Sequence, residues 1–122
     1  MRWRLKSSSL LKFFSWIRST TRTNPLHKLD FPAFDWPAAD PPRYKYPLAE
    51  NAEYNRQQDE QSLADVRAKI AQWKEEKGQE VVAIILEPIM SEGGDNQISA
   101  EFAQGVQDIT KELGIFFIVD EV

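Results

Sequence analysis

Two carboxylates each follow an apolar run, in positions where a ligand site could form. Glu87 comes after the run Val-Val-Ala-Ile-Ile-Leu at 81–86, and Asp120 comes after Ile-Phe-Phe-Ile-Val at 115–119. Apolar runs of this kind are typical of strands that are buried on both faces of a parallel sheet. Ligands of open α/β sheets bind at the carboxyl ends of such strands. We therefore expect both acids to face one site.

The residues between these two strands predict a connecting helix. Ser99 is a suitable N-cap, and Gly114 is a suitable C-terminal stop. Between them, apolar residues recur at helical spacing, at positions 102, 106, 109 and 113. A strand, a helix and a strand form one βαβ unit, whose crossover leaves the strands parallel. Both carboxylates then lie at the same edge of the sheet, and Pro88 ends the first strand just after Glu87.

The length and composition indicate a piece of a larger domain. Two strands and a helix cannot cover both faces of such an apolar sheet in 122 residues. The formal charge of -4 is unevenly distributed, because residues 1–29 hold seven bases and no acid, leaving eight bases and nineteen acids. With no cysteine and a single histidine, His27, the sequence predicts no disulfide, no thiolate nucleophile and no metal site.

Residues 1–18 form a basic amphipathic leader. The segment is rich in Arg and Ser and free of acids, which is typical of a mitochondrial transit peptide or of a helix lying on a membrane surface. Lys12 interrupts its apolar side, so the segment is not a transmembrane span. A leader without a function is an equal alternative.

An extended loop and a long helix are expected between the leader and the first strand. Residues 24–48 hold six of the seven prolines together with five aromatic residues, which excludes helix and favours an ordered loop against another protein surface. A free Pro-rich recognition peptide is the alternative. Residues 51–77 predict a polar helix ending at Gly78, with Ser62 and Asp65 as a capping pair for an inner start. Its expected apolar stripe consists of Leu63, Val66, Ile70 and Trp73.

An apolar strand that ends in Asp-Glu also occurs in P-loop ATPases, where the acid holds magnesium. That hypothesis needs the motif G-x-x-x-x-G-K-[ST] upstream, and none of the five glycines begins one. A purely structural strand end with a solvated acid is the default interpretation of Asp120 taken alone.

Taken together, the two strand ends resemble class III pyridoxal-phosphate aminotransferases. The resemblance rests on EPIMSEGGDN at 87–96 and FFIVDEV at 116–122. Within this class, SEGGDN at 91–96, HKLDFPAFDWP at 27–37 and KYPL at 45–48 are similar to the 4-aminobutyrate aminotransferases. The resemblance covers residues 19–122. It implies an α/β fold, namely part of a fold-type-I large domain with one βαβ unit, a long helix and an extended Pro- and aromatic-rich loop.

The resemblance also implies roles for three residues. Asp120 would bond the pyridine nitrogen of pyridoxal 5'-phosphate and keep it protonated. Val122 would pack against the ring face. Glu87 would lie in the pocket and pair with an arginine until an acidic co-substrate such as 2-oxoglutarate needs it. Met90 departs from the glutamine that the family pattern leads us to expect.

The same resemblance implies what the chain lacks. The Schiff-base lysine of the family lies beyond the Asp-Glu-Val strand, so we expect no catalytic residue here and a fragment that is inactive alone. The parent enzyme would be a homodimer that moves the amino group of 4-aminobutyrate onto 2-oxoglutarate, with small amino and keto acids as partners and no nucleic acid or membrane. A non-catalytic subunit that associates with the full-length enzyme is the alternative. The compartment, cytoplasmic or mitochondrial, stays open.

Overall fold

The computed structural model describes residues 35–90 and 94–121. The chain divides into two compact units between Trp36 and Pro37, and all the helices and strands described here lie in the second unit. The predicted leader, and the first part of the predicted loop, lie outside the described residues. No helix within the described ranges is long and apolar enough to cross a membrane.

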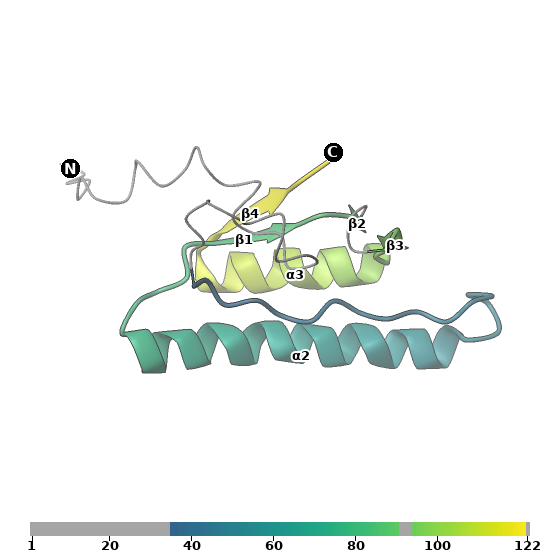
Figure 1. Ribbon diagram of the computed structural model, residues 1–122, viewed down its shortest axis with the longest axis horizontal. Helices are drawn as coiled ribbons and strands as arrows, with labels where there is room; N and C mark the ends of the chain where they lie inside the picture. Colours follow the sequence, from purple (N-terminus) through teal and green to yellow (C-terminus); the bar gives the residue numbers. More distant parts are fainter. Residues whose placement is uncertain (1–34, 91–93, 122) are drawn as a thin grey trace. The chain divides into compact units, whose positions relative to one another are not determined.

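A two-stranded parallel sheet and the helix that connects its strands confirm the predicted βαβ unit (Figure 1). Strand β1 covers Ala83–Leu86 and strand β4 covers Phe116–Val119, and they pair in register from Ala83 with Phe116 to Leu86 with Val119. Both strands are shorter than the apolar runs that predict them.

Helix α3 (Ala100–Leu113) is the crossover, with the predicted ends. The Ser99 hydroxyl accepts a hydrogen bond from the Phe102 amide at 2.9 Å, and Gly114 adopts a left-handed conformation with φ 66°. The helix contacts both β4 and the long helix α2 (Ala52–Lys77), and Figure 1 shows it between the sheet and α2. Its buried side chains therefore form the centre of the core: Phe102, Val106, Ile109 and Thr110.

A short hairpin interrupts the path from β1 to α3. Strands β2 (Ile89–Met90) and β3 (Asn96–Gln97) pair antiparallel, and the Asp95 amide donates to the Met90 carbonyl at 2.9 Å. Asp95 has φ 54°, a left-handed conformation that Asp tolerates better than most residues. The two strands have two residues each, which is too short to give a strand pattern in the sequence.

Helix α2 (Ala52–Lys77) is continuous, so the predicted capping pair for an inner start is wrong. Ser62 lies in the middle of the helix and is buried. The helix ends as predicted at Gly78, whose amide bonds the Lys74 carbonyl at 3.0 Å. Of the expected apolar stripe, only Val66 is buried, and the other three residues are half-buried. The buried face of α2 also carries three polar side chains: Asn55, Asp59 and Ser62.

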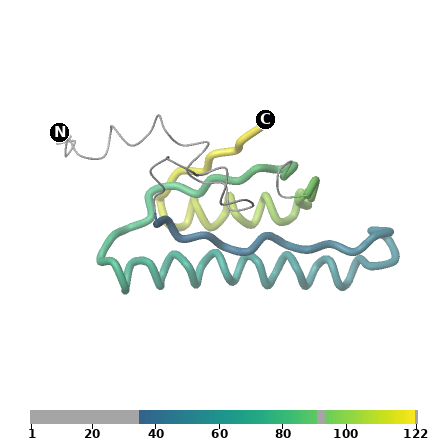
Figure 2. The backbone as a smooth tube through the Cα atoms, in the orientation of Figure 1, coloured from purple at the N-terminus to yellow at the C-terminus, as the bar shows by residue number. Residues whose placement is uncertain are grey.

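The polar face of α2 has a partner, which is the extended segment 37–47. This segment has little regular secondary structure, as predicted, and it runs antiparallel to α2 (Figure 2). Its main chain bonds to α2 side chains: the Asp40 amide donates to Asp65 at 2.8 Å, and the Lys45 amide donates to Asn55 Oδ1 at 2.8 Å. Asn55 Nδ2 returns a bond to the Lys45 carbonyl at 3.0 Å. We call this set of contacts between 37–47 and α2 the polar seam.

Helices α2 and α3 approach closely where Gly105 meets Leu63. A Cβ atom on Gly105 would lie 2.5 Å from Leu63 Cδ1 and 2.9 Å from Cδ2, closer than van der Waals contact permits. Glycine costs helix stability relative to alanine, about 1 kcal/mol in a helix interior. At this position its lack of a side chain leaves room for Leu63.

Gly105→Ala should therefore destabilise the chain by about 1 kcal/mol, because the overpacking cost of about 1–3 kcal/mol exceeds the gain in helix propensity. Urea unfolding followed by circular dichroism measures this change. In a Leu63→Ala background the same substitution should be stabilising, since the clash is gone. Equal stabilisation in both backgrounds would show that the contact does not constrain position 105.

Candidate functional site

The two predicted acids lie next to each other at the carboxyl edge of the sheet. Strands β1 and β4 are hydrogen-bonded neighbours, and the Asp120 amide donates to the Leu86 carbonyl at 2.9 Å. Glu87 and Asp120 each follow the last registered residue of their strand, and both are half-buried. The expectation that adjacent parallel strands carry both acids is confirmed. Val122, the third predicted site residue, lies outside the described residues.

The hairpin after Glu87 begins and ends beside it. The Ile98 amide donates to the Pro88 carbonyl at 3.1 Å, which closes the base of the hairpin. Ile98 directly precedes Ser99, the N-cap of α3. The position of Glu87 is therefore tied both to β4, through the sheet, and to the start of α3.

A second polar cluster joins the segment 37–47, α2 and the start of α3. The Tyr44 hydroxyl donates to Asp59 Oδ1, and the Ser99 hydroxyl donates to Asp59 Oδ2 at 2.8 Å. The Ser99 amide donates to the Tyr44 hydroxyl oxygen at 3.0 Å. Burial, and to a smaller extent the bond to Asp59, raise the pKa of the Tyr44 hydroxyl to about 12. Tyr44 therefore stays protonated near neutral pH and remains a donor.

Sequence reasoning missed this cluster for a physical reason. Tyr44, Asp59 and Ser99 belong to three different elements, and they are brought together only by tertiary packing. The one available signal was the cap motif at Ser99, which identifies that residue but not its partners.

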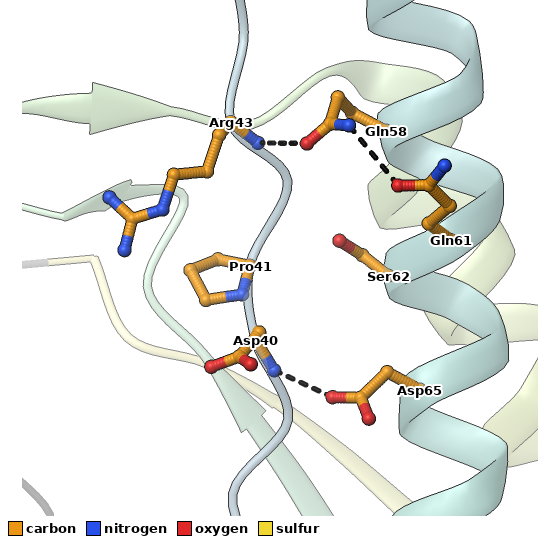
Figure 3. A pocket seen from close by; sticks show the side chains of 7 residues that line it. All are labelled: Asp40, Pro41, Arg43, Gln58, Gln61, Ser62 and Asp65. Atoms are coloured by element: carbon orange, nitrogen blue, oxygen red, sulfur yellow. Dashed lines mark hydrogen bonds between the residues drawn. The ribbon is translucent and has the colours of Figure 1, made fainter.

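A polar groove of about 360 Å³ lies along the polar seam (Figure 3). Two hydrogen bonds span it, from the Asp40 amide to Asp65 and from the Arg43 amide to Gln58 at 3.4 Å. Neither strand-end acid lines this groove. It is lined by Asp40, Pro41, Arg43, Gln58, Gln61, Ser62 and Asp65. The groove is thus a gap within the polar seam, separate from the strand-end site.

Comparison with known families identifies the chain. Residues 16–122 match the model of the family described as aminotransferase class III. The chain belongs to this family. A probable mitochondrial 4-aminobutyrate aminotransferase of Caenorhabditis elegans is 59% identical over 104 residues, which is 85% of this chain and 21% of the relative. The 4-aminobutyrate aminotransferase of Saccharomyces cerevisiae is 50% identical, and the human mitochondrial enzyme of that name is 44% identical, each over 85% of this chain and 21% of the relative.

Solved structures give the same fold. A lysine aminotransferase from M. tuberculosis superposes with a TM-score of 0.71 at 30% sequence identity, covering 88% of this chain and 23% of that protein. The α/β fold of a pyridoxal-phosphate aminotransferase is therefore confirmed for the described elements. The chain spans about a fifth of the length of the curated relatives that it matches.

Proposed function

We propose that this chain is part of an enzyme that transfers the amino group of 4-aminobutyrate to 2-oxoglutarate. The observation that carries the proposal is the side-by-side placement of Glu87 and Asp120 at the ends of neighbouring parallel strands, in a chain of this family. The identities of 59% and 50% to 4-aminobutyrate aminotransferases support this choice of substrate.

Pyridoxal 5'-phosphate is the cofactor that the class III family implies, and the donor set at the strand ends fits it. A half-buried carboxylate such as Asp120 is a suitable acceptor for a protonated ring nitrogen. When bound, the cofactor supplies a ring that withdraws the electrons left after the amino donor loses a proton. Asp120 would keep that nitrogen protonated. The hydrogen bond from the Asp120 amide to the Leu86 carbonyl fixes the main-chain position of Asp120.

Glu87 would act on the substrate side of the same site. Its carboxylate would pair with an arginine of the complete protein and release it when the dicarboxylate 2-oxoglutarate binds. This exchange would let one site accept both a substrate with one carboxylate and a substrate with two. Val122 would pack against the cofactor ring.

Residues 1–122 alone should not catalyse transamination, because the resemblance gives none of the lysines in this stretch the role of the Schiff-base lysine. We further propose residues 19–122 as part of the cofactor-binding large domain and residues 1–18 as a separate leader. The family match begins at residue 16, within three residues of this proposed boundary. The relatives from C. elegans and human are named mitochondrial, and a cytoplasmic location is the other candidate.

A chimera tests the roles of the two acids. The matched stretch of this chain would replace the corresponding 104 residues of the C. elegans relative. Loss of a hydrogen bond to a charged group costs about 1.5–3 kcal/mol, so Asp120→Asn should lower kcat/KM by roughly 10- to 100-fold. Glu87→Gln should raise the KM for 2-oxoglutarate more than the KM for 4-aminobutyrate. Steady-state kinetics with both substrates measure these effects.

Glu121→Gln is the matched control, because Glu121 is an exposed carboxylate adjacent to Asp120. Glu121→Gln should leave kcat/KM and the KM values for both substrates unchanged. An inactive unsubstituted chimera, or an Asp120→Asn chimera as active as the parent, would contradict the proposal.

Association with another polypeptide is a second candidate function, favoured by exposed apolar side chains around the sheet. Phe116 is 75% exposed and Val82 is 70% exposed, and Val119 and Ile89 are also exposed. Exposed apolar residues gathered at strands mark interaction or aggregation surfaces.

The isolated chain should therefore self-associate as its concentration rises. Sedimentation velocity should show species larger than a monomer, and Phe116→Lys with Val82→Lys should shift the distribution toward monomer. Leu48→Lys, at an exposed apolar residue away from the strands, is the control. A wild-type chain that stays monomeric and unfolds cooperatively would contradict this prediction.

A further inference from the structure

The described part of the chain holds a buried polar network around Asp59 that the proposed chemistry does not use. Asp59 is 9% exposed and accepts hydrogen bonds from the hydroxyl groups of Tyr44 and Ser99. No ion pair to Asp59 occurs within the described ranges. A buried carboxylate is costly unless its oxygens are well bonded. The burial of the Asp59 carboxylate therefore needs a physical reason.

The start of α3 supplies part of that reason. The first amides of a helix lack partners within the helix, and they give its N-terminus a partial positive charge. The Ser99 hydroxyl oxygen accepts a hydrogen bond from one of these amides, that of Phe102, and the same hydroxyl donates to Asp59 Oδ2 at 2.8 Å. The Asp59 carboxylate thus lies one hydroxyl group away from the helix N-terminus, where its two oxygens accept hydrogen bonds from Tyr44 and Ser99.

Tyr44 completes the network from the opposite side. Its hydroxyl accepts from the Ser99 amide at 3.0 Å and donates to Asp59. Ser99 is thereby held at its main chain and at its side chain by two different elements. Fixing one residue at both points restricts its position and its orientation.

The constraint continues along the chain to Glu87. Ile98, the residue before Ser99, donates its amide to the Pro88 carbonyl at 3.1 Å. Glu87 and Pro88 are consecutive residues, so the main chain that carries the Glu87 side chain is bonded to the residue next to Ser99. The segment 37–47 and α2 therefore restrict the main-chain position of Glu87 through Ser99, Ile98 and Pro88.

We propose that Tyr44, Asp59 and Ser99 are positioning residues for Glu87, a role that rests on the proposed function of Glu87. Tyr44 and Asp59 fix the start of α3, and the Ile98 amide transmits that constraint to the Glu87–Pro88 main chain. The extended segment 37–47 therefore has two roles: it packs against α2, and through Tyr44 it helps to hold the main chain at Glu87 in place.

Hydrogen exchange on the full chain is the first test, at a concentration low enough to keep it monomeric. Tyr44→Phe removes one hydroxyl group, and it should raise the exchange rates of the Ile98 and Ser99 amides roughly 10-fold. The Asp120 amide, bonded within the sheet, should keep its rate. Tyr46→Phe is the matched control, because Tyr46 is 65% exposed, and it should change none of these amides. Unchanged exchange at Ile98, or an equal rise at all amides, would overturn the proposal.

A second variant keeps the test decisive if Tyr44→Phe unfolds the chain, as loss of the helical circular dichroism signal would reveal. Asp59→Asn keeps the side-chain volume and one acceptor oxygen, so it should preserve the fold. It should raise exchange at the Ile98 and Ser99 amides and leave Asp120 unchanged. No response at Ile98 in a folded Asp59→Asn chain would equally overturn the proposal.

Kinetics of the chimera separate positioning from general stability. Tyr44→Phe should raise the KM for 2-oxoglutarate in the same direction as Glu87→Gln, with a smaller change in the KM for 4-aminobutyrate. The double variant should be no worse than the more damaged single variant, because both act through one side chain. Additive effects would overturn the positioning role. If the unsubstituted chimera is inactive, the proposed function fails, and the exchange results alone decide whether the network controls the Glu87–Pro88 main chain.

Discussion

The structure depends on how the main chain of a proline-rich segment obtains its hydrogen bonds. Prolines keep residues 37–47 out of a helix and limit their ability to join a sheet. The amide and carbonyl groups of this segment still need partners once they are covered. Helix α2 provides them from its side chains, with Asn55 bonding both the amide and the carbonyl of Lys45. A helix face that would otherwise be apolar is therefore polar and buried.

This polar face determines how α3 is held. Packing between α2 and α3 is close at Leu63 and Gly105, while the hydrogen bond that Ser99 donates to Asp59 fixes the start of α3. Apolar contact alone would allow a helix to slide or rotate. The directional bonds at Ser99 set its axial position, and the chain then enters β4 in register with β1. The placement of Asp120 beside Glu87 follows from that register.

The strand-end pair could be predicted from the sequence because its signals are local. Apolar runs ending in acids, a serine cap and a glycine stop each depend on a few consecutive residues, and the βαβ rule converts them into a shared edge. The polar seam could not be predicted in this way. Asp59 and Asn55 look like ordinary solvent-exposed helix residues, and only their pairing with residues 10 to 40 positions away accounts for their burial. The polar pair Ser62 and Asp65 resembles a helix start in sequence, but Asp65 accepts a hydrogen bond from the Asp40 amide and Ser62 lies buried beside the groove.

The closed base of the β2–β3 hairpin has a consequence for how this protein can vary. The bond between the Ile98 amide and the Pro88 carbonyl holds both ends of the hairpin together independently of its tip. Insertions or deletions between Met90 and Asn96 would therefore change what the tip presents to its surroundings while the main chain at Glu87 stays in place.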